Sequence, residues 1–260
     1  MPVFQAGDFF TDHRSPLQDR WGGWYVTGTH GDVTHMGNAV VRDREHPEKL
    51  EGAAGLNVTD LTGKFETGAY LTPHSDIVAL MTLEHQTRIT NLITRVGYET
   101  AMALRDQAKF NQAYHQRADE MSESTRHRID SAVEEMLQYM LFVDEAKLDA
   151  PIKGTSGFAE SFQKAGLPDR KGRSLRDLDL QTRLFRYPLS YMIYSEAFDG
   201  MPEGARQRIY RRLFDVLTEK DKSKRYQGLS AIDRRAILEI LRDTRKGLPA
   251  YWKSATLAVR

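Results

Sequence analysis

The chain has 260 residues, of which 40% are hydrophobic and 28% are charged, and its formal net charge is +1. This length allows one large domain or two small ones with a buried core. The near balance of charge excludes a general attraction to nucleic acid or to anionic membranes. The absence of cysteine excludes disulfides, thiolate metal sites and covalently attached haem within the chain.

The sequence predicts neither a transmembrane segment nor a signal peptide. No stretch is long and apolar enough to predict a transmembrane segment. The first residues, MPVFQAGDFF, lack the basic and then apolar regions of a signal peptide.

Residues 1–72 predict a loop-rich arm that contains little β-structure. This part is rich in Gly, Thr, Asp and Pro, and its strand-like runs are short, such as WYVTG at 24–28. A segment of this length without helices is usually functional or wraps a neighbouring domain.

Residues 73–260 predict a helical domain, so the expected fold class is mainly α with about six or seven helices. Apolar residues recur there at helical spacing, and Ser, Gly and Pro mark starts and stops. We expect helices at about 74–109, 119–143, 157–165, 177–198, 203–218 and 230–247.

Two features of this helical part allow more than one interpretation. Aromatic residues at helical spacing between Tyr187 and Phe198 predict core packing, with the wall of a cofactor pocket as the alternative. Residues 200–260 contain 15 Lys and Arg against 7 Asp and Glu. This excess predicts a solvated basic face, with a docking patch for an acidic partner as the alternative.

The richest candidate site lies at residues 20–38, RWGGWYVTGTHGDVTHMGN. His30 and His35 stand in glycine-rich backbone that can curl around a ligand, and histidine is the commonest protein ligand for metals and haem iron. Trp21, Trp24 and Tyr25 add large rings. Solvated loop histidines are the simpler interpretation.

His85 is the second candidate, because Met81, His85, Ile89 and Leu92 share one stripe of the first predicted helix. A buried imidazole needs a partner, and Glu84 beside it is a candidate metal ligand or a hydrogen-bond acceptor. His74 is a further candidate ligand. A core histidine without a cofactor fits the same pattern. No phosphate-binding loop, nucleophile elbow, zinc-protease motif or di-iron Glu-x-x-His pair occurs.

Several long blocks resemble a family of largely uncharacterised bacterial c-type cytochrome-like proteins. These blocks are SPLQDRWGGWYVTGTHGDVTHMGN, YLTPHSDIVALMTLEHQTRITNLITR, RLFRYPLSYMIYSEAFD and ILRDTRKGLPAYW. Members of the family are exported and carry a Cys-x-x-Cys-His haem-attachment segment upstream of the tryptophan-rich block. This chain has no such segment, and Leu189 stands where the family tends to have a cysteine.

The resemblance implies haem as a cofactor and a periplasmic or cell-surface location, although the sequence leaves a cytoplasmic location open. One of the four matched histidines is then a candidate axial ligand, with Trp21, Trp24 and Tyr25 as apolar walls that exclude water. The four are His30, His35, His74 and His85.

Three hypotheses for function follow. The first is a haem-associated electron-transfer protein that works with a redox partner or with a haem-bearing segment outside this chain. The second is a non-haem metalloenzyme in which these histidines and Glu84 bind a metal ion. The third is a non-catalytic helical interaction module. The sequence does not decide whether the protein is an enzyme, and it predicts no nucleic-acid partner.

Overall fold

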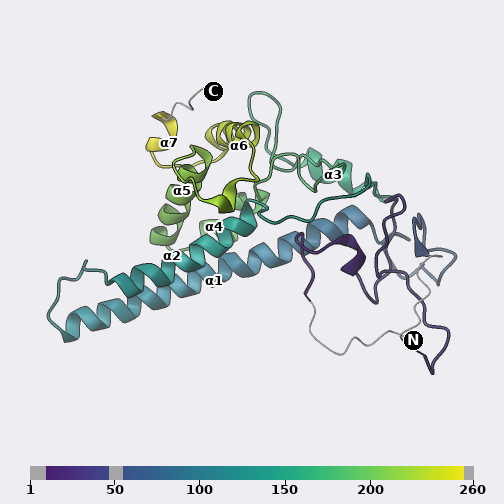
Figure 1. The fold of residues 1–260 in the computed structure, drawn as a ribbon, viewed down its shortest axis with the longest axis horizontal. Coiled ribbons are helices and arrows are strands. Elements are labelled where there is room, and N and C mark those ends of the chain that lie inside the picture. The colour runs from purple at the N-terminus through teal and green to yellow at the C-terminus, as the bar shows by residue number, and fades with distance from the viewer. Residues whose placement is uncertain (1–9, 47–54, 255–260) are drawn as a thin grey trace. The chain divides into compact units, whose positions relative to one another are not determined.

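The computed structural model describes residues 10–46 and 55–254, and this part of the chain is mainly helical (Figure 1). It contains seven α-helices, and its β-structure consists of isolated bridges such as Thr27 with Asp76 and Thr29 with Lys153. The mainly α prediction with six or seven helices is therefore confirmed. Within the described ranges, no helix has the length and apolar character needed to cross a membrane.

Most predicted helices occur close to their expected bounds. The observed helices are α1 (Ile77–Ala113), α2 (Glu123–Met140), α3 (Phe158–Lys164), α4 (Glu196–Asp199), α5 (Glu203–Leu217), α6 (Ala231–Thr244) and α7 (Tyr251–Ser254). Ser230 caps α6 as the sequence predicts, because its hydroxyl accepts a hydrogen bond from the Asp233 backbone N–H at 3.0 Å.

The helix predicted over residues 177–198 is wrong. Leu180 has a φ of +58°, and its N–H bonds the Arg183 carbonyl, so the chain turns back at this point. Leu178 and Phe185 form an antiparallel bridge across that turn. Only the short 3-10 helix Tyr191–Tyr194 and α4 are helical in this range, because pairing across the turn satisfies the backbone groups that a helix would otherwise use.

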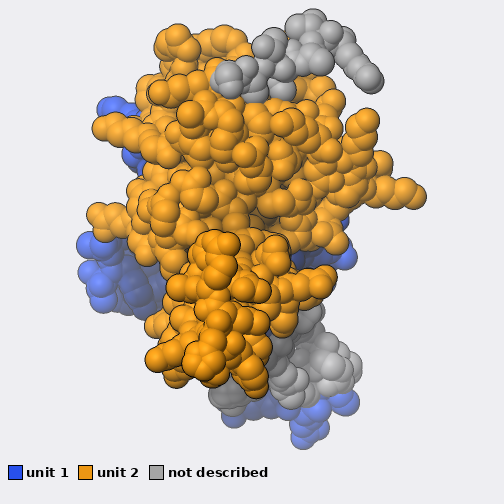
Figure 2. Space-filling view, turned by 90° about the vertical axis from the view of Figure 1, so that its left-hand side faces the viewer, with its two compact units in different colours: residues 1–86, 144–166, 176–186 blue, residues 87–143, 167–175, 187–260 orange. Residues whose placement is uncertain are grey.

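The chain divides into two compact units, which Figure 2 colours separately. Unit 1 comprises residues 1–86, 144–166 and 176–186. Unit 2 comprises residues 87–143, 167–175 and 187–260. The predicted arm, residues 1–72, lies within unit 1, together with the first turns of α1.

In unit 1, the buried Asp76 carboxylate joins the start of α1 to the loop before α3. One carboxylate oxygen accepts hydrogen bonds from the Val78 and Ala79 N–H groups and caps α1. The other accepts from the N–H groups of Thr155 and Ser156 and from the Ser156 hydroxyl. Burial raises the pKa of Asp76, but these hydrogen bonds outweigh it and the net pKa is lowered.

In unit 2, α1 and α2 run antiparallel (Figure 1). Polar contacts join the two helices. Glu99 pairs with Arg128 at 2.6 Å, and the Gln107 side-chain oxygen accepts from Ser122 and Thr125. The core beside them is aliphatic and aromatic. Its fully buried members include Met136, Leu137, Met140, Leu213, Val216, Ile237, Ile240 and Trp252.

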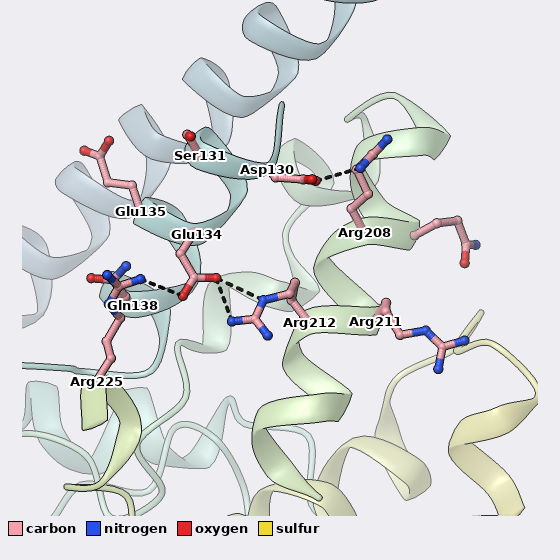
Figure 3. A pocket seen from close by; sticks show the side chains of 10 residues that line it. Asp130, Ser131, Glu134, Glu135, Gln138, Arg208, Arg211, Arg212 and Arg225 are labelled. Atoms are coloured by element: carbon pink, nitrogen blue, oxygen red, sulfur yellow. Dashed lines mark hydrogen bonds and ion pairs between the residues drawn. The ribbon is translucent and has the colours of Figure 1, made fainter. Parts of the chain in front are cut away.

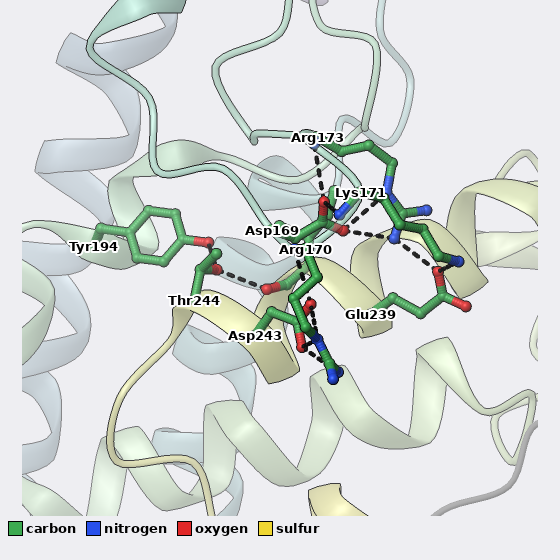
Figure 4. A network of polar contacts seen from close by, with 9 residues as sticks. Asp169, Arg170, Lys171, Arg173, Tyr194, Glu239, Asp243 and Thr244 are labelled. Atoms are coloured by element: carbon green, nitrogen blue, oxygen red, sulfur yellow. Dashed lines mark hydrogen bonds and ion pairs between the residues drawn. The ribbon is translucent and has the colours of Figure 1, made fainter.

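A charged network fixes the loop 167–175 to α6, as Figure 4 shows. The fully buried Asp169 carboxylate accepts from the N–H groups of Lys171 and Arg173 and from the Arg173 guanidinium at 2.6 Å. Arg173 also pairs with Glu239 of α6 at 2.7 Å, and Arg170 pairs with Asp243 at 2.7 Å. The loop therefore takes its position from ion pairs with one face of α6.

We expect Gly154→Ala to destabilise unit 1, because a Cβ at this position would lie 2.4 Å from Asp76 Oδ2. Forced overpacking of this kind costs about 1–3 kcal/mol. Gly63→Ala is the control, because a Cβ there meets nothing within 4 Å. Urea unfolding should show a loss of stability for Gly154→Ala only; equal stabilities would show that the contact is readily relieved.

We expect Asp169→Ala to lower the free energy of unfolding by roughly 1–3 kcal/mol, because it leaves buried donors of the loop without an acceptor. Asp243→Ala should have a smaller effect, since its partner Arg170 is 88% exposed. Thermal melts of both variants test this difference. A larger loss for Asp243→Ala would mean that burial does not set the strength of this network.

Candidate functional site

The segment 20–38 closes on itself through backbone hydrogen bonds. The Met36 N–H bonds the Arg20 carbonyl at 3.0 Å, and the Asn38 N–H bonds the Trp24 carbonyl at 2.9 Å. The Asn38 amide also bonds both backbone groups of Val26. Trp21 and Asn38 both have a positive φ, of 65° and 60°. The two ends of the segment are therefore held side by side, as a ligand-enclosing loop requires.

Three rings of this segment pack together in the interior of unit 1. Trp21, His30 and His35 are all buried. The His30 and His35 ring centroids are 4.7 Å apart, and the Trp21 ring meets His35 edge-on at 5.6 Å. The structure thus brings together two of the four predicted histidines and one of the three predicted aromatic walls.

His30 has a hydrogen bond at each ring nitrogen. Its Nδ1 lies 2.6 Å from the Val33 carbonyl oxygen, and its Nε2 accepts from the Asn57 N–H at 3.2 Å. Since a carbonyl can only accept, Nδ1 carries the hydrogen and the ring is neutral. Burial lowers the pKa of His30, and the Val33 carbonyl partly opposes this. Both nitrogens of the His30 imidazole therefore stabilise the loop through hydrogen bonds.

His35 differs, because its Nε2 has no hydrogen-bond partner among the described residues although its side chain is only 6% exposed, and its Nδ1 side faces the Gly37 backbone. Burial lowers the pKa of His35 to about 4, the neighbouring His30 lowers it further, and the Gly37 backbone opposes the shift. A Cβ at Gly37 would lie 2.5 Å from Val26 and 3.0 Å from His35 Nδ1. Glycine at 37 thus allows the ring to take this place.

The other predicted site residues lie away from the Trp21, His30 and His35 rings. Trp24 and Tyr25 are 59% and 47% exposed, and Tyr25 packs on Phe65 instead. The half-buried His74 lies before α1, and its Nδ1 is 3.2 Å from the Thr59 carbonyl oxygen. The predicted ligand set is thus spread over unit 1.

His85 is fully buried, as the helical stripe predicts, but its partner is His13. The two Nδ1 atoms are 3.0 Å apart, so one of them carries the hydrogen and the other accepts it. The His85 ring also meets Phe185 edge-on at 6.0 Å. The sequence does not identify His13 as this partner, and its only signal is that six of the eight histidines lie in the first 85 residues.

Glu84 is occupied by partners from the arm. It accepts from the Thr11 hydroxyl at 2.8 Å and pairs with Arg20 at 3.1 Å, and the Arg20 side chain is only 2% exposed. Burial raises the pKa of Glu84, and the Arg20 charge and the Thr11 hydrogen bond oppose this. A second buried carboxyl, Glu145, accepts from the Leu184 N–H at 2.9 Å. Burial raises the pKa of Glu145 to about 7.

The described part of the chain contains no group of three or more His, Asp or Glu side chains arranged to hold a metal ion. Unit 1 contains a pair of mutually bonded imidazoles, a His30 imidazole that is bonded at both nitrogens, and a buried His35 imidazole whose Nε2 has no hydrogen-bond partner among the described residues. A neutral imidazole nitrogen of this kind can bind iron.

No protein-family model, curated protein or solved structure matches this chain. The likeness to the cytochrome-like family therefore rests on the sequence blocks quoted above.

We expect the His13–His85 pair to make unit 1 sensitive to acid. Burial lowers the pKa of both rings, that of His85 to about 3, from an ordinary value of 6.5. The unfolded chain therefore binds more protons below about pH 6.5, and stability present above that pH is lost as the pH falls. Thermal melts between pH 7.5 and pH 5 should show a steeper loss for the wild type than for His13→Gln/His85→Gln.

His74→Gln is the matched control, because it removes one half-buried histidine of the same unit. It should keep the wild-type pH dependence. If the double variant does so as well, the pair does not cause the sensitivity to acid.

Proposed function

We propose that unit 1 is the haem-contacting part of an electron-transfer protein, and that His35 would be the residue of this chain that holds the haem iron. The observation that carries the proposal is the buried His35 imidazole, whose Nε2 has no hydrogen-bond partner in the described residues. A buried polar group without a partner is rare and calls for an explanation such as an absent ion. Iron coordination is one such explanation.

Three of the other predicted ligands already have hydrogen-bond or ion-pair partners, and this distinguishes His35 from them. His30 uses both nitrogens to hold the loop, His85 is bonded to His13, and Glu84 is paired with Arg20. The low pKa of His35 keeps its ring neutral at physiological pH, which is the state that binds metal. Because the Nδ1 side of the ring lies against Gly37, we assign Nε2 as the coordinating atom.

The residues around His35 would control its environment. When bound, haem supplies a one-electron couple between ferric and ferrous iron. Trp21 keeps water from one side of the His35 ring, and His30 limits the movement of the ring from another. Exclusion of water at a haem ligand favours the less charged ferrous state and raises the potential.

We propose that the haem is brought by another segment or polypeptide, because a chain without cysteine cannot attach it covalently. The family resemblance supports this arrangement, because its members carry the attachment segment upstream of the tryptophan-rich block. It also supports the proposal of a periplasmic or cell-surface location.

The test uses a soluble haem peptide that contains a Cys-x-x-Cys-His segment and therefore lacks only its sixth ligand. We expect the wild-type chain to convert its spectrum to the low-spin form, with a shifted Soret band, because an imidazole is a strong axial ligand. His35→Ala should abolish the shift, while His74→Ala should keep it. Circular dichroism checks that both variants are folded.

Two outcomes would contradict the proposal. One is the absence of any spectral change with the wild-type chain, and the other is an unchanged shift with folded His35→Ala. Metal analysis of the purified protein then addresses the alternative of a non-haem metal site.

A further inference from the structure

Seven of the 15 Lys and Arg residues in the basic C-terminal part have ion-pair or carbonyl partners in unit 2. Figure 3 shows Arg212 and Arg225 converging on Glu134 of α2 and Arg208 turned to Asp130. The remaining engaged side chains pair with carboxylates or donate to backbone carbonyls; they are Arg206, Arg234, Arg242 and Arg245. The charge excess of this part therefore resides in the other cations.

Several exposed cations of this part have no carboxylate partner among the residues that the structure describes. We call the five on α5, on the residues that follow it and on α7 the cationic patch: Arg211, Lys220, Lys222, Lys224 and Lys253. Lys224 begins the 3-10 helix Lys224–Tyr226.

Contacts with aromatic rings join the parts of this patch. The Arg211 guanidinium lies 3.9 Å from the centre of the Tyr251 ring, and the Lys220 ammonium lies 5.2 Å from that of Phe214. Tyr251 and Phe214 in turn meet edge-on at 5.0 Å. Figure 3 shows the Arg211 side chain pointing away from the Glu134 cluster. The two cations are thus held on rings, while their N–H groups stay open to a ligand.

Nearby carboxylates do not neutralise the patch. Asp221 lies between Lys220 and Lys222 in the sequence, but it is turned to Arg212 at 2.8 Å and is largely covered. Asp215 and Glu219 remain near the patch, so five positive charges face two negative ones.

We propose that the cationic patch binds an acidic segment of a partner protein. Lys220 and Lys222 stand on either side of Asp221, whose side chain is turned to Arg212, and an extended peptide presents its alternate side chains on one face. The patch offers no open ring for stacking bases, because Phe214 is buried and Arg211 covers Tyr251. Carboxylates paired with these cations have the charge complementarity that selects partners and steers association.

The test measures binding of a fluorescently labelled deca-glutamate peptide to the full chain by anisotropy. We expect Arg211→Gln/Lys222→Gln to weaken binding roughly fivefold or more, because two of the ion pairs are lost. Lys109→Gln/Arg126→Gln is the matched control, since it removes one exposed Lys and one exposed Arg from α1 and α2. It should change the affinity less than twofold. Added salt should weaken wild-type binding.

A second variant, Lys222→Gln/Lys224→Gln, should behave like the first, and it removes side chains that make no hydrogen bond or ion pair in the described residues. The proposal is overturned if the wild type does not bind the peptide, or if patch and control variants lose affinity equally. It is also overturned if phosphatidylserine vesicles or oligothymidine bind more tightly than the peptide at the same salt concentration.

Discussion

The buried ion pair between Arg20 and Glu84 is the contact on which the organisation of unit 1 depends. The Arg20 guanidinium also donates two hydrogen bonds to the Ser15 carbonyl. Arg20 therefore links the arm to Glu84 of α1. An uncompensated charge in the interior is very costly, and the arm must therefore remain against the first turns of α1. That placement sets His13 beside His85, and it fixes the backbone position from which Trp21 reaches His35.

The histidines of unit 1 show how burial and hydrogen bonding divide similar side chains into different roles. Burial keeps His13, His30, His35 and His85 neutral. Both His30 nitrogens are hydrogen-bonded to backbone groups, so this residue is structural. His13 and His85 are hydrogen-bonded to each other and join two segments. The Nε2 of His35 lies in the same interior without such a bond. This difference, rather than the presence of histidine as such, is what supports a ligand role at one position.

In unit 2, in contrast, many charged side chains form ion pairs on the surface of its helices. Glu134 receives Arg212, Arg225 and the Tyr226 hydroxyl, and the Asp169 network fixes a loop to α6. A count of basic residues in the sequence cannot separate these structural cations from those that are open to a partner. Their contacts separate them, and five of the cations without a carboxylate partner in the described residues lie on α5, on the residues that follow it and on α7.

The sequence by itself determined the local features. Periodic apolar residues and the Ser230 cap gave the long helices and the mainly α class, and the stripe on the first helix gave the burial of His85. These features depend on residues within a few turns of one another. The 177–198 helix failed because contacts across a turn replaced the local preference. Only the tertiary structure decided that His85 meets His13, 72 residues away, and that both His30 nitrogens are bonded while His35 Nε2 is not. Hydrogen-bond partners of this kind are chosen by the path of the backbone, and no spacing in the sequence encodes that path.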